Sequence, residues 1–166
     1  FILGRIIFQW RSSLTAAQKY SHNIVYRFLW HADIWIFLNL VLAILMSIPA
    51  VNVYTHGTHI TVAHAMGTTI GINSFLLLGI TCDILLDECV PARINTRLLK
   101  KGQQLTNLSL LVFWMALIAA GIVKSKWQMS TIKPVYFELM LQLRPYFIAF
   151  FIAGIGITTG FLIIII

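Results

Sequence analysis

The sequence predicts an all-α membrane protein with about four transmembrane helices. Hydrophobic residues make up 59% of the chain and charged residues only 10%. The mean hydropathy of +0.87 is far above that of soluble domains. Four apolar segments reach the length of about 20 residues that crosses a bilayer core. They are Phe28–Ala50, Thr58–Leu86, Gln104–Val123 and Glu138–Ile166.

The first 27 residues form a separate unit in this interpretation. Phe1–Gln9 is apolar but interrupted by Gly4 and Arg5, and we expect it to be the end of a preceding span. Arg11–Arg27 mixes polar and apolar residues, as short interfacial helices or loops do. Residues 1–27 are therefore predicted to be the end of a helix plus a cytoplasmic-side interfacial segment. Residues 28–166 are predicted to be the four-helix part of a larger bundle.

The first span begins with aromatic residues and ends at a proline. Trp30 and Trp35 suit the aromatic belt at a membrane interface, and Pro49 ends the helix. His31 and Asp33 lie about one turn inside. They form either an interfacial polar pair or a polar contact with another subunit or a proton route, and the sequence leaves these alternatives open.

Lys and Arg residues predict the orientation of the spans. Four precede the first span and four lie between the second and third, whereas three lie between the third and fourth. In chain order they are Arg5, Arg11, Lys19 and Arg27; Arg93, Arg97, Lys100 and Lys101; and Lys124, Lys126 and Lys133. By the positive-inside rule, the first two groups face the cytoplasm. This distribution explains the net charge of +7 without a nucleic-acid partner. The three outer lysines could dock an acidic partner domain.

The third and fourth spans carry a few polar residues. Asn107, Ser109 and Trp114 would give the third span polar contacts. Arg144 lies early in the fourth span, where it would reach the outer interface or pair with an acidic neighbour or an anionic cofactor substituent.

The second span concentrates the side chains that bind metals. His56, His59, His64 and Met66 all lie at or inside it, and ionisable residues at membrane depth are usually paired, liganded or functional. His64 and Met66 are two residues apart, which is a rotation of about 200° along an α-helix. Such a helix could stand between two flat cofactors and offer each an axial ligand. His64 would lie about 9 Å below Thr58, in the outer half of the membrane.

The two faces of this helix differ. On a wheel of about 100° per residue, Gly67, Thr68 and Gly71 share the face of His64, where the glycines would clear a flat slot for a porphyrin. The alternative is a helix-packing ridge of small residues, Ala63-xxx-Gly67-xxx-Gly71. Met66 lies on the opposite face with His59. A single Met in a span is ordinarily a packing residue, but Met and His are both axial heme ligands.

These residues resemble the nitric oxide reductase branch of the heme-copper oxidase superfamily. The resemblance lies in Val51-Asn-Val-Tyr-Thr-His-Gly-Thr-His-Ile-Thr-Val-Ala-His64, where His56-Gly57-Thr58 is more like nitric oxide reductases than oxygen-reducing relatives. Phe37–Pro49, Phe113–Gly121 and Leu143–Phe147 resemble the neighbouring helices. The resemblance implies the last four helices of a twelve-helix catalytic subunit in a bacterial cytoplasmic membrane, with two hemes toward its outer side.

The resemblance also implies roles for single residues. His64 corresponds to the axial ligand of a high-spin heme b. Met66 stands where the family has a second histidine, the ligand of a low-spin heme b. Either this variant uses His/Met ligation, or the low-spin heme is held differently or is absent. His56 corresponds to a rim position near heme propionates, and His59 has no firm counterpart. A non-heme iron or copper would be held by residues outside this chain.

The implied function is respiratory reduction of nitric oxide to nitrous oxide. Electrons would pass from the low-spin heme to a high-spin heme and non-heme metal centre. The implied partners are the remaining helices of the catalytic subunit and a cytochrome c-type or other electron-donor subunit, all in a lipid bilayer. The alternatives are another reaction of the superfamily, oxygen reduction or nitric oxide dismutation, and a non-catalytic membrane scaffold whose histidines only form hydrogen bonds.

Overall fold

The computed structural model describes Arg5, Phe8, Gln9, Ser12 and residues 23–88, 95–131 and 135–165. Four helical stretches in this part of the chain are long and apolar enough to cross a membrane. They are Asn23–Ser47, His59–Leu85, Thr96–Met129 and Tyr136–Ile165. The predicted all-α membrane fold is thereby confirmed. The predictions for Phe1–Gln9 and for Arg11, Lys19, Arg93 and Lys133 fall wholly or mostly outside the described residues.

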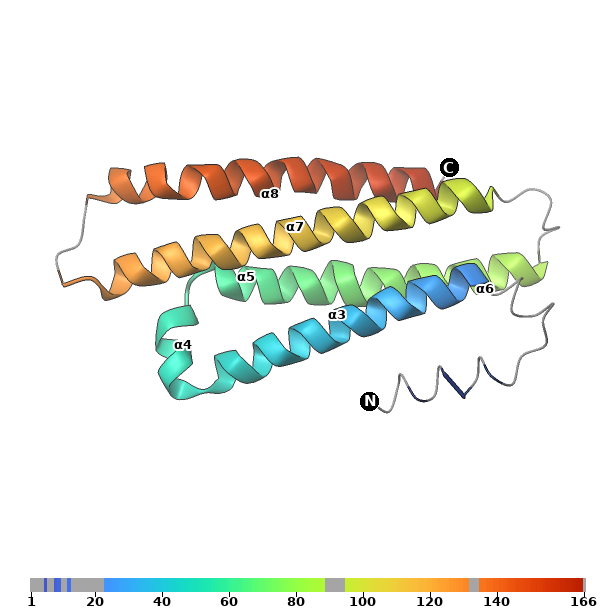
Figure 1. Ribbon diagram of the computed structural model, residues 1–166, viewed down its shortest axis with the longest axis horizontal. Coiled ribbons are helices and arrows are strands. Elements are labelled where there is room, and N and C mark those ends of the chain that lie inside the picture. The colour runs from blue at the N-terminus through green and yellow to red at the C-terminus, as the bar shows by residue number, and fades with distance from the viewer. Residues whose placement is uncertain are drawn as a thin grey trace.

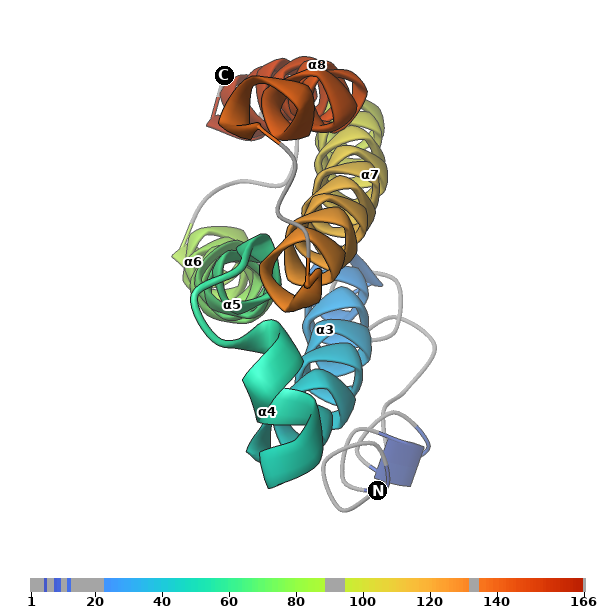
Figure 2. The same cartoon turned by 90° about the vertical axis from the view of Figure 1, so that its left-hand side faces the viewer.

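The helices form an antiparallel bundle arranged around α7 (Thr96–Met129) (Figure 1). Helices α3 (Asn23–Ser47) and α7 run in one direction, and α8 (Tyr136–Ile165) runs in the other. The second span also runs against α7 and consists of α5 (His59–Met66), the π-helix η1 (Gly67–Ser74) and α6 (Phe75–Glu88). Figure 2 shows α8 on one side of α7, and α3 and α5–α6 on the other.

A short helix at one end of the bundle was not predicted. The first span ends at Ser47, as expected from Pro49, but the chain continues into α4 (Pro49–Thr55). Pro49 occupies the first turn of α4, where a missing N–H and a fixed φ are tolerated. We call this end of the bundle, with α4, the start of α8 and the end of α7, the α4 end.

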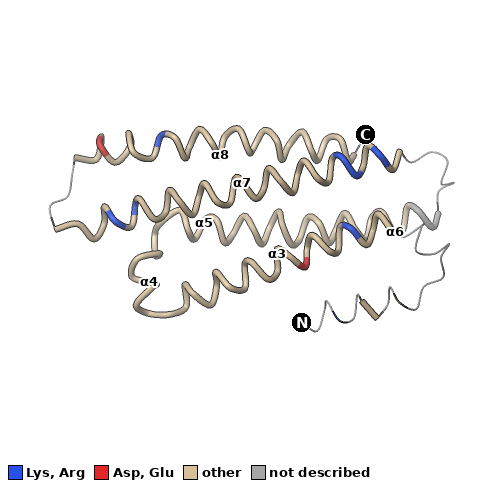
Figure 3. The backbone as a smooth tube through the Cα atoms, in the orientation of Figure 1, with Lys and Arg blue, Asp and Glu red and all other residues tan. Residues whose placement is uncertain are grey.

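Helix α7 is longer than predicted because its beginning is capped within the basic segment. The side chain of Asn95 accepts a hydrogen bond from the backbone nitrogen of Leu98 at 3.2 Å. The residues that follow, including Lys100 and Lys101, are good helix formers. The 34 residues of α7 correspond to about 51 Å, so both ends extend beyond an apolar core of about 30 Å. Figure 3 shows Lys and Arg near both ends of this helix and few charges between them.

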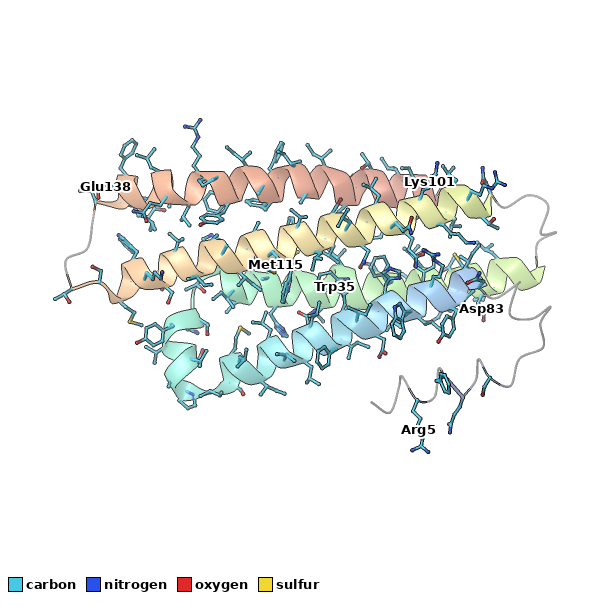
Figure 4. The ribbon with its side chains drawn as sticks, in the orientation of Figure 1. Arg5, Trp35, Asp83, Lys101, Met115 and Glu138 are labelled. Atoms are coloured by element: carbon cyan, nitrogen blue, oxygen red, sulfur yellow. The ribbon has the colours of Figure 1, made fainter. Side chains whose placement is uncertain are left out.

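The core lies between α3, the second span and α7. Its largest fully buried side chains include Phe28, Trp35, Phe75 and Leu110. The prediction that Trp35 belongs to an interfacial belt is wrong, because this side chain is 1% exposed in the middle of the bundle (Figure 4). It lies 12 residues, or about 18 Å, beyond the start of α3. Trp30, by contrast, is 51% exposed, as a belt residue would be.

Glycines allow α7 to approach its neighbours closely. A Cβ on Gly160 of α8 would stand 2.8 Å from the backbone nitrogen of Thr106 and 3.0 Å from the carbonyl oxygen of Gly102. A Cβ on Gly121 would stand 2.8 Å from the backbone nitrogen of Ile60 in α5. These contacts are the small-residue packing by which membrane helices associate where water does not drive them together.

Candidate functional site

The loop before α5 is fixed by hydrogen bonds between short side chains and backbone. The hydroxyl of Thr58 donates to the carbonyl of Thr55 at 2.7 Å and accepts from the backbone nitrogen of Ile60 at 3.3 Å, which caps the helix. Gly57 adopts φ of 68°, a conformation that favours glycine. Lys124 Nζ donates to the carbonyl of Gly57 at 2.8 Å, so α7 holds the loop in place. The position of His64 along the bundle is therefore set from its N-terminal side.

His64 and Met66 both lie in regular α-helix. Helix α5 ends at Met66, and the π-helical segment begins at Gly67. The offset of about 200° between the two side chains therefore holds. His59 and Met66, seven residues apart in the same helix, share a face.

Beyond Met66 the helix winds differently from the prediction. Residues Gly67–Ser74 form π-helix, whose i→i+5 bonds turn the chain by less than 100° per residue. The wheel that placed Gly71 on the face of His64 assumed α-helix throughout, so it does not apply past Met66. Short π-segments occur frequently at functional sites, and this one directly follows the two candidate ligands.

The two glycines of the π-segment pack against α3. A Cβ on Gly67 would overlap the side-chain amide of Asn39, and a Cβ on Gly71 would stand 2.5 Å from Trp35 Cγ. Ala63, which precedes them in the proposed ridge, is fully buried. The structure thus has the small-residue packing ridge that the sequence offered as the alternative to an open slot. A contact of Gly67 or Gly71 with a heme remains a prediction.

His64 is partly buried in the bundle. Its Nδ1 is buried and has no hydrogen-bond partner among the described residues. The carbonyl of His64 accepts from the hydroxyl of Thr68 at 3.0 Å, so Thr68 is engaged with the backbone at the start of the π-segment. The imidazole is accordingly placed inside the bundle with one buried ring nitrogen that lacks a partner within the described part of the chain, and such a buried polar atom calls for an explanation.

The opposite face of α5 is bordered by aromatic rings. The ring of His59 lies 5.3 Å from that of Phe147 in α8. Phe147 in turn contacts Phe150 at 5.7 Å, and Phe150 contacts Phe113 at 5.5 Å, all in edge-to-face geometry. Phe113 and Phe150 line an apolar groove of 420 Å³ on α7 and α8. Met66 lies on this face of the helix, two turns beyond His59, and packs partly buried against the core.

His56 lies apart from the other candidate ligands. It is exposed in the loop at the α4 end. With Asn52 and Gln128 it lines an open cleft of 760 Å³ between α4 and the end of α7. The structure therefore separates the four predicted side chains into a rim residue, His56, and three residues on α5.

A row of buried polar side chains between α3 and α7 was largely missed from the sequence. Trp35 Nε1 donates to Asn107 Oδ1 at 2.8 Å, and Asn39 Nδ2 donates to the carbonyl of Trp35 at 3.0 Å. Toward the other end, Arg27 Nε donates to Gln103 Oε1 at 3.3 Å. The spacing of four along α3 could have revealed this row, because Arg27, His31, Trp35 and Asn39 share one helix face.

The polar contacts of His31 lie inside the bundle. His31 Nδ1 lies 2.6 Å from the carbonyl of Arg27 and 3.4 Å from Gln103 Nε2. These polar neighbours are on α3 and α7. The pairing of His31 with Asp33, and its contact with another subunit or a proton route, stay predictions. Of the polar residues predicted for the third span, Asn107 is hydrogen-bonded, whereas Trp114 Nε1 is buried without a partner in the described part of the chain.

The donor chemistry of α5 fits axial ligation of an iron porphyrin. Imidazole and thioether are both heme ligands, and the ligand nitrogen and sulfur lie on different sides of one helix. No group of three His, Cys, Asp or Glu side chains that could hold a metal ion comes together among the described residues. A single axial position on each face is what these residues can supply.

The fold defines a multi-pass, all-α membrane subunit. The chain belongs to the family described as cytochrome c and quinol oxidase polypeptide I, whose family model matches residues 3–156. This is subunit I of the heme-copper oxidases, an oxidoreductase family that typically binds heme. The match confirms the superfamily that the sequence resembled. No curated protein and no solved structure matches the chain significantly.

Proposed function

We propose that this chain is the heme-ligating part of a nitric oxide reductase-like catalytic subunit. The observation that carries the proposal is the pair His64 and Met66, two residues apart in regular α-helix, in a chain of the heme-copper oxidase family. The resemblance of His56-Gly57-Thr58 to the reductase branch favours nitric oxide over oxygen as substrate. The net reaction would be 2 NO + 2 H⁺ + 2 e⁻ → N₂O + H₂O.

The chain's own contribution to this reaction would be ligation and spacing. His64 would hold a high-spin heme b through Nε2, and Met66 would hold a low-spin heme b on the other face. The hemes would supply electron transfer and iron chemistry that the side chains lack. The aromatic row from His59 to Phe113 would border the second heme and keep water from it. Gly67, Thr68 and Gly71 would shape the helix that separates the two cofactors, and His56 would serve propionates at the rim.

The remaining parts of the machinery would come from outside these residues. A non-heme iron or copper would be held by earlier helices of the catalytic subunit. A cytochrome c-type or other electron-donor subunit would dock at the α4 end, where Lys124 and Lys126 lie. In a bacterial cytoplasmic membrane, this end and the hemes would be on the outer side.

The test is a reduced-minus-oxidised spectrum of the complete complex purified from its own membranes. We expect b-type heme signals and consumption of nitric oxide with formation of nitrous oxide. His64→Ala should remove the high-spin heme, while the matched variant His31→Ala, on α3, should retain it. A complex without b-type heme would contradict the proposal and favour a scaffold. A heme-containing complex that reduces oxygen, or that releases dioxygen from nitric oxide, would agree with the proposed heme ligands but contradict nitric oxide reduction as the reaction.

A further inference from the structure

A buried acceptor lies within one helical turn of His64. The side chain of Asn39 is 3% exposed, and its amide packs against the backbone of Gly67, where a Cβ would otherwise be. Gly67 follows His64 by three residues, which places the two on adjacent turns, and its N–H points to the carbonyls of Ala63 and His64. Asn39 therefore lies against the helix at the level of the candidate ligand.

The amide of Asn39 is oriented by a second contact. Its Nδ2 donates to the carbonyl of Trp35 at 3.0 Å, and a carbonyl can only accept, so the amide cannot be reversed. Trp35 is itself fixed, because its Nε1 donates to Asn107 and its ring contacts that of Trp114 at 6.0 Å. The oxygen of Asn39 is consequently held by a rigid support.

The buried side-chain donors and acceptors that lack a hydrogen-bond partner among the described residues are complementary. Among the described residues, the buried side-chain atoms without a partner are Asn39 Oδ1 and three ring nitrogens, those of His59, His64 and Trp114. Asn39 Oδ1 accepts only, and a buried carbonyl without a donor costs about 1–3 kcal/mol. A histidine that ligates a metal through Nε2 usually donates Nδ1–H to an oxygen, which fixes its tautomer and raises its basicity.

We infer that Asn39 is a positioning residue for His64, with Asn39 Oδ1 as the acceptor for the Nδ1–H of the imidazole. This inference rests on the proposed function, because it concerns His64 as a heme ligand. In the absence of this acceptor the ring could rotate and either nitrogen could carry the proton. With it, Nε2 is the free ligand atom and the imidazole is the stronger electron donor.

The experiment is resonance Raman spectroscopy of the reduced complete complex, which reports the iron–histidine stretching band. Asn39→Leu keeps the approximate shape of the side chain and removes the acceptor, so the band should move to lower frequency and heme affinity should fall about 10- to 100-fold. Asn39→Asp keeps an oxygen at this position and should leave the band at or above its original frequency. The matched variant Asn107→Leu loosens the support of Trp35 but leaves the acceptor in place, so it should lower the band less than Asn39→Leu does.

The outcomes separate this inference from the proposed function. An unchanged band in Asn39→Leu, with a clear band in the unsubstituted complex, would overturn the inference alone. A change confined to the indole N–H signal of Trp114 would assign the oxygen to that donor instead and would also overturn it. Absence of b-type heme from the unsubstituted complex would refute the proposed function. If Asn39→Leu does not assemble, Asn39→Ser, whose hydroxyl stays near its own backbone, should give the same shift.

Discussion

Met66 stands at the position where the nitric oxide reductases that the sequence resembles are expected to have a histidine. It packs partly buried on the face of α5 that it shares with His59. A thioether ligand stabilises reduced heme iron relative to a second imidazole and so raises the potential. The identity of this one side chain would therefore set how readily the low-spin heme receives an electron.

We expect Met66→His to lower the reduction potential of the low-spin heme, because it replaces the thioether with a more basic ligand. We expect Met66→Leu to abolish the low-spin spectrum, because it removes the ligand. A redox titration of the purified complex measures both. Met115→Leu is the matched control, because Met115 is an exposed methionine on α7. If all three variants retain the original potential, Met66 is a packing residue.

A second prediction concerns the hydrogen bond between Trp35 and Asn107. Asn107→Leu would leave the buried indole N–H without an acceptor and should lower the free energy of unfolding by about 1–3 kcal/mol. Trp35→Phe in the same background should cost less than it does alone, because the donor is removed with the acceptor. Denaturant unfolding of the detergent-solubilised complex gives this double-mutant cycle. Strictly additive losses would show that the bond contributes nothing measurable.

At the scale of helices, α7 organises the bundle through close contacts at glycines. Its approach to α8 depends on Gly102 and Gly160, and its approach to α5 depends on Gly121 facing Ile60. Because α7 also fastens the loop before α5 through Lys124, it sets both the position of α5 along the bundle and its distance from α7. The buried polar row between α3 and α7 fixes α3 at the same level.

The α7–α8 contact yields a matched pair of substitutions on one helix. Gly160→Ala would place a methyl group 2.8 Å from the backbone of Thr106, which must move, and should destabilise by about 1–3 kcal/mol. Gly154→Ala meets only a Phe113 ring atom at 3.9 Å, and should be neutral or stabilise by up to about 1 kcal/mol. Thermal unfolding in detergent compares the two. Equal effects would mean that α8 is free to shift.

For the whole molecule, orientation is the main prediction that follows from charge. The α4 end carries Lys124 and Lys126, whereas the opposite end carries Arg27, Arg97, Lys100 and Lys101. The positive-inside rule places the latter end in the cytoplasm. The α4 end, with His56 and the cleft between α4 and α7, would then face the outside, where an electron donor can approach.

Cysteine labelling in intact cells tests this orientation. In a background with Cys82 and Cys89 replaced by Ser, a membrane-impermeant maleimide should label Met129→Cys, at the α4 end. Thr96→Cys, at the start of α7, should react only after the cells are permeabilised, because the bilayer separates it from the reagent. If Thr96→Cys alone were labelled in intact cells, the orientation would be the opposite of the predicted one, with the α4 end in the cytoplasm.

The four spans can be predicted from the amino-acid sequence, because membrane insertion depends on the apolar length of each segment and that length is local. The offset between His64 and Met66 can be predicted from it as well, because both lie in one regular helix whose geometry is fixed by the backbone. Which side chains pack against which helices depends instead on contacts between segments far apart in the sequence. Trp35 and Asn39 are residue types that also occur at membrane interfaces, so the sequence does not distinguish a buried position from an interfacial one. In the structure, contacts with α7 and with Gly67 bury both side chains. The π-segment after Met66 depends on packing as well, since small residues there allow α3 to come close and no local signal specifies i→i+5 bonds.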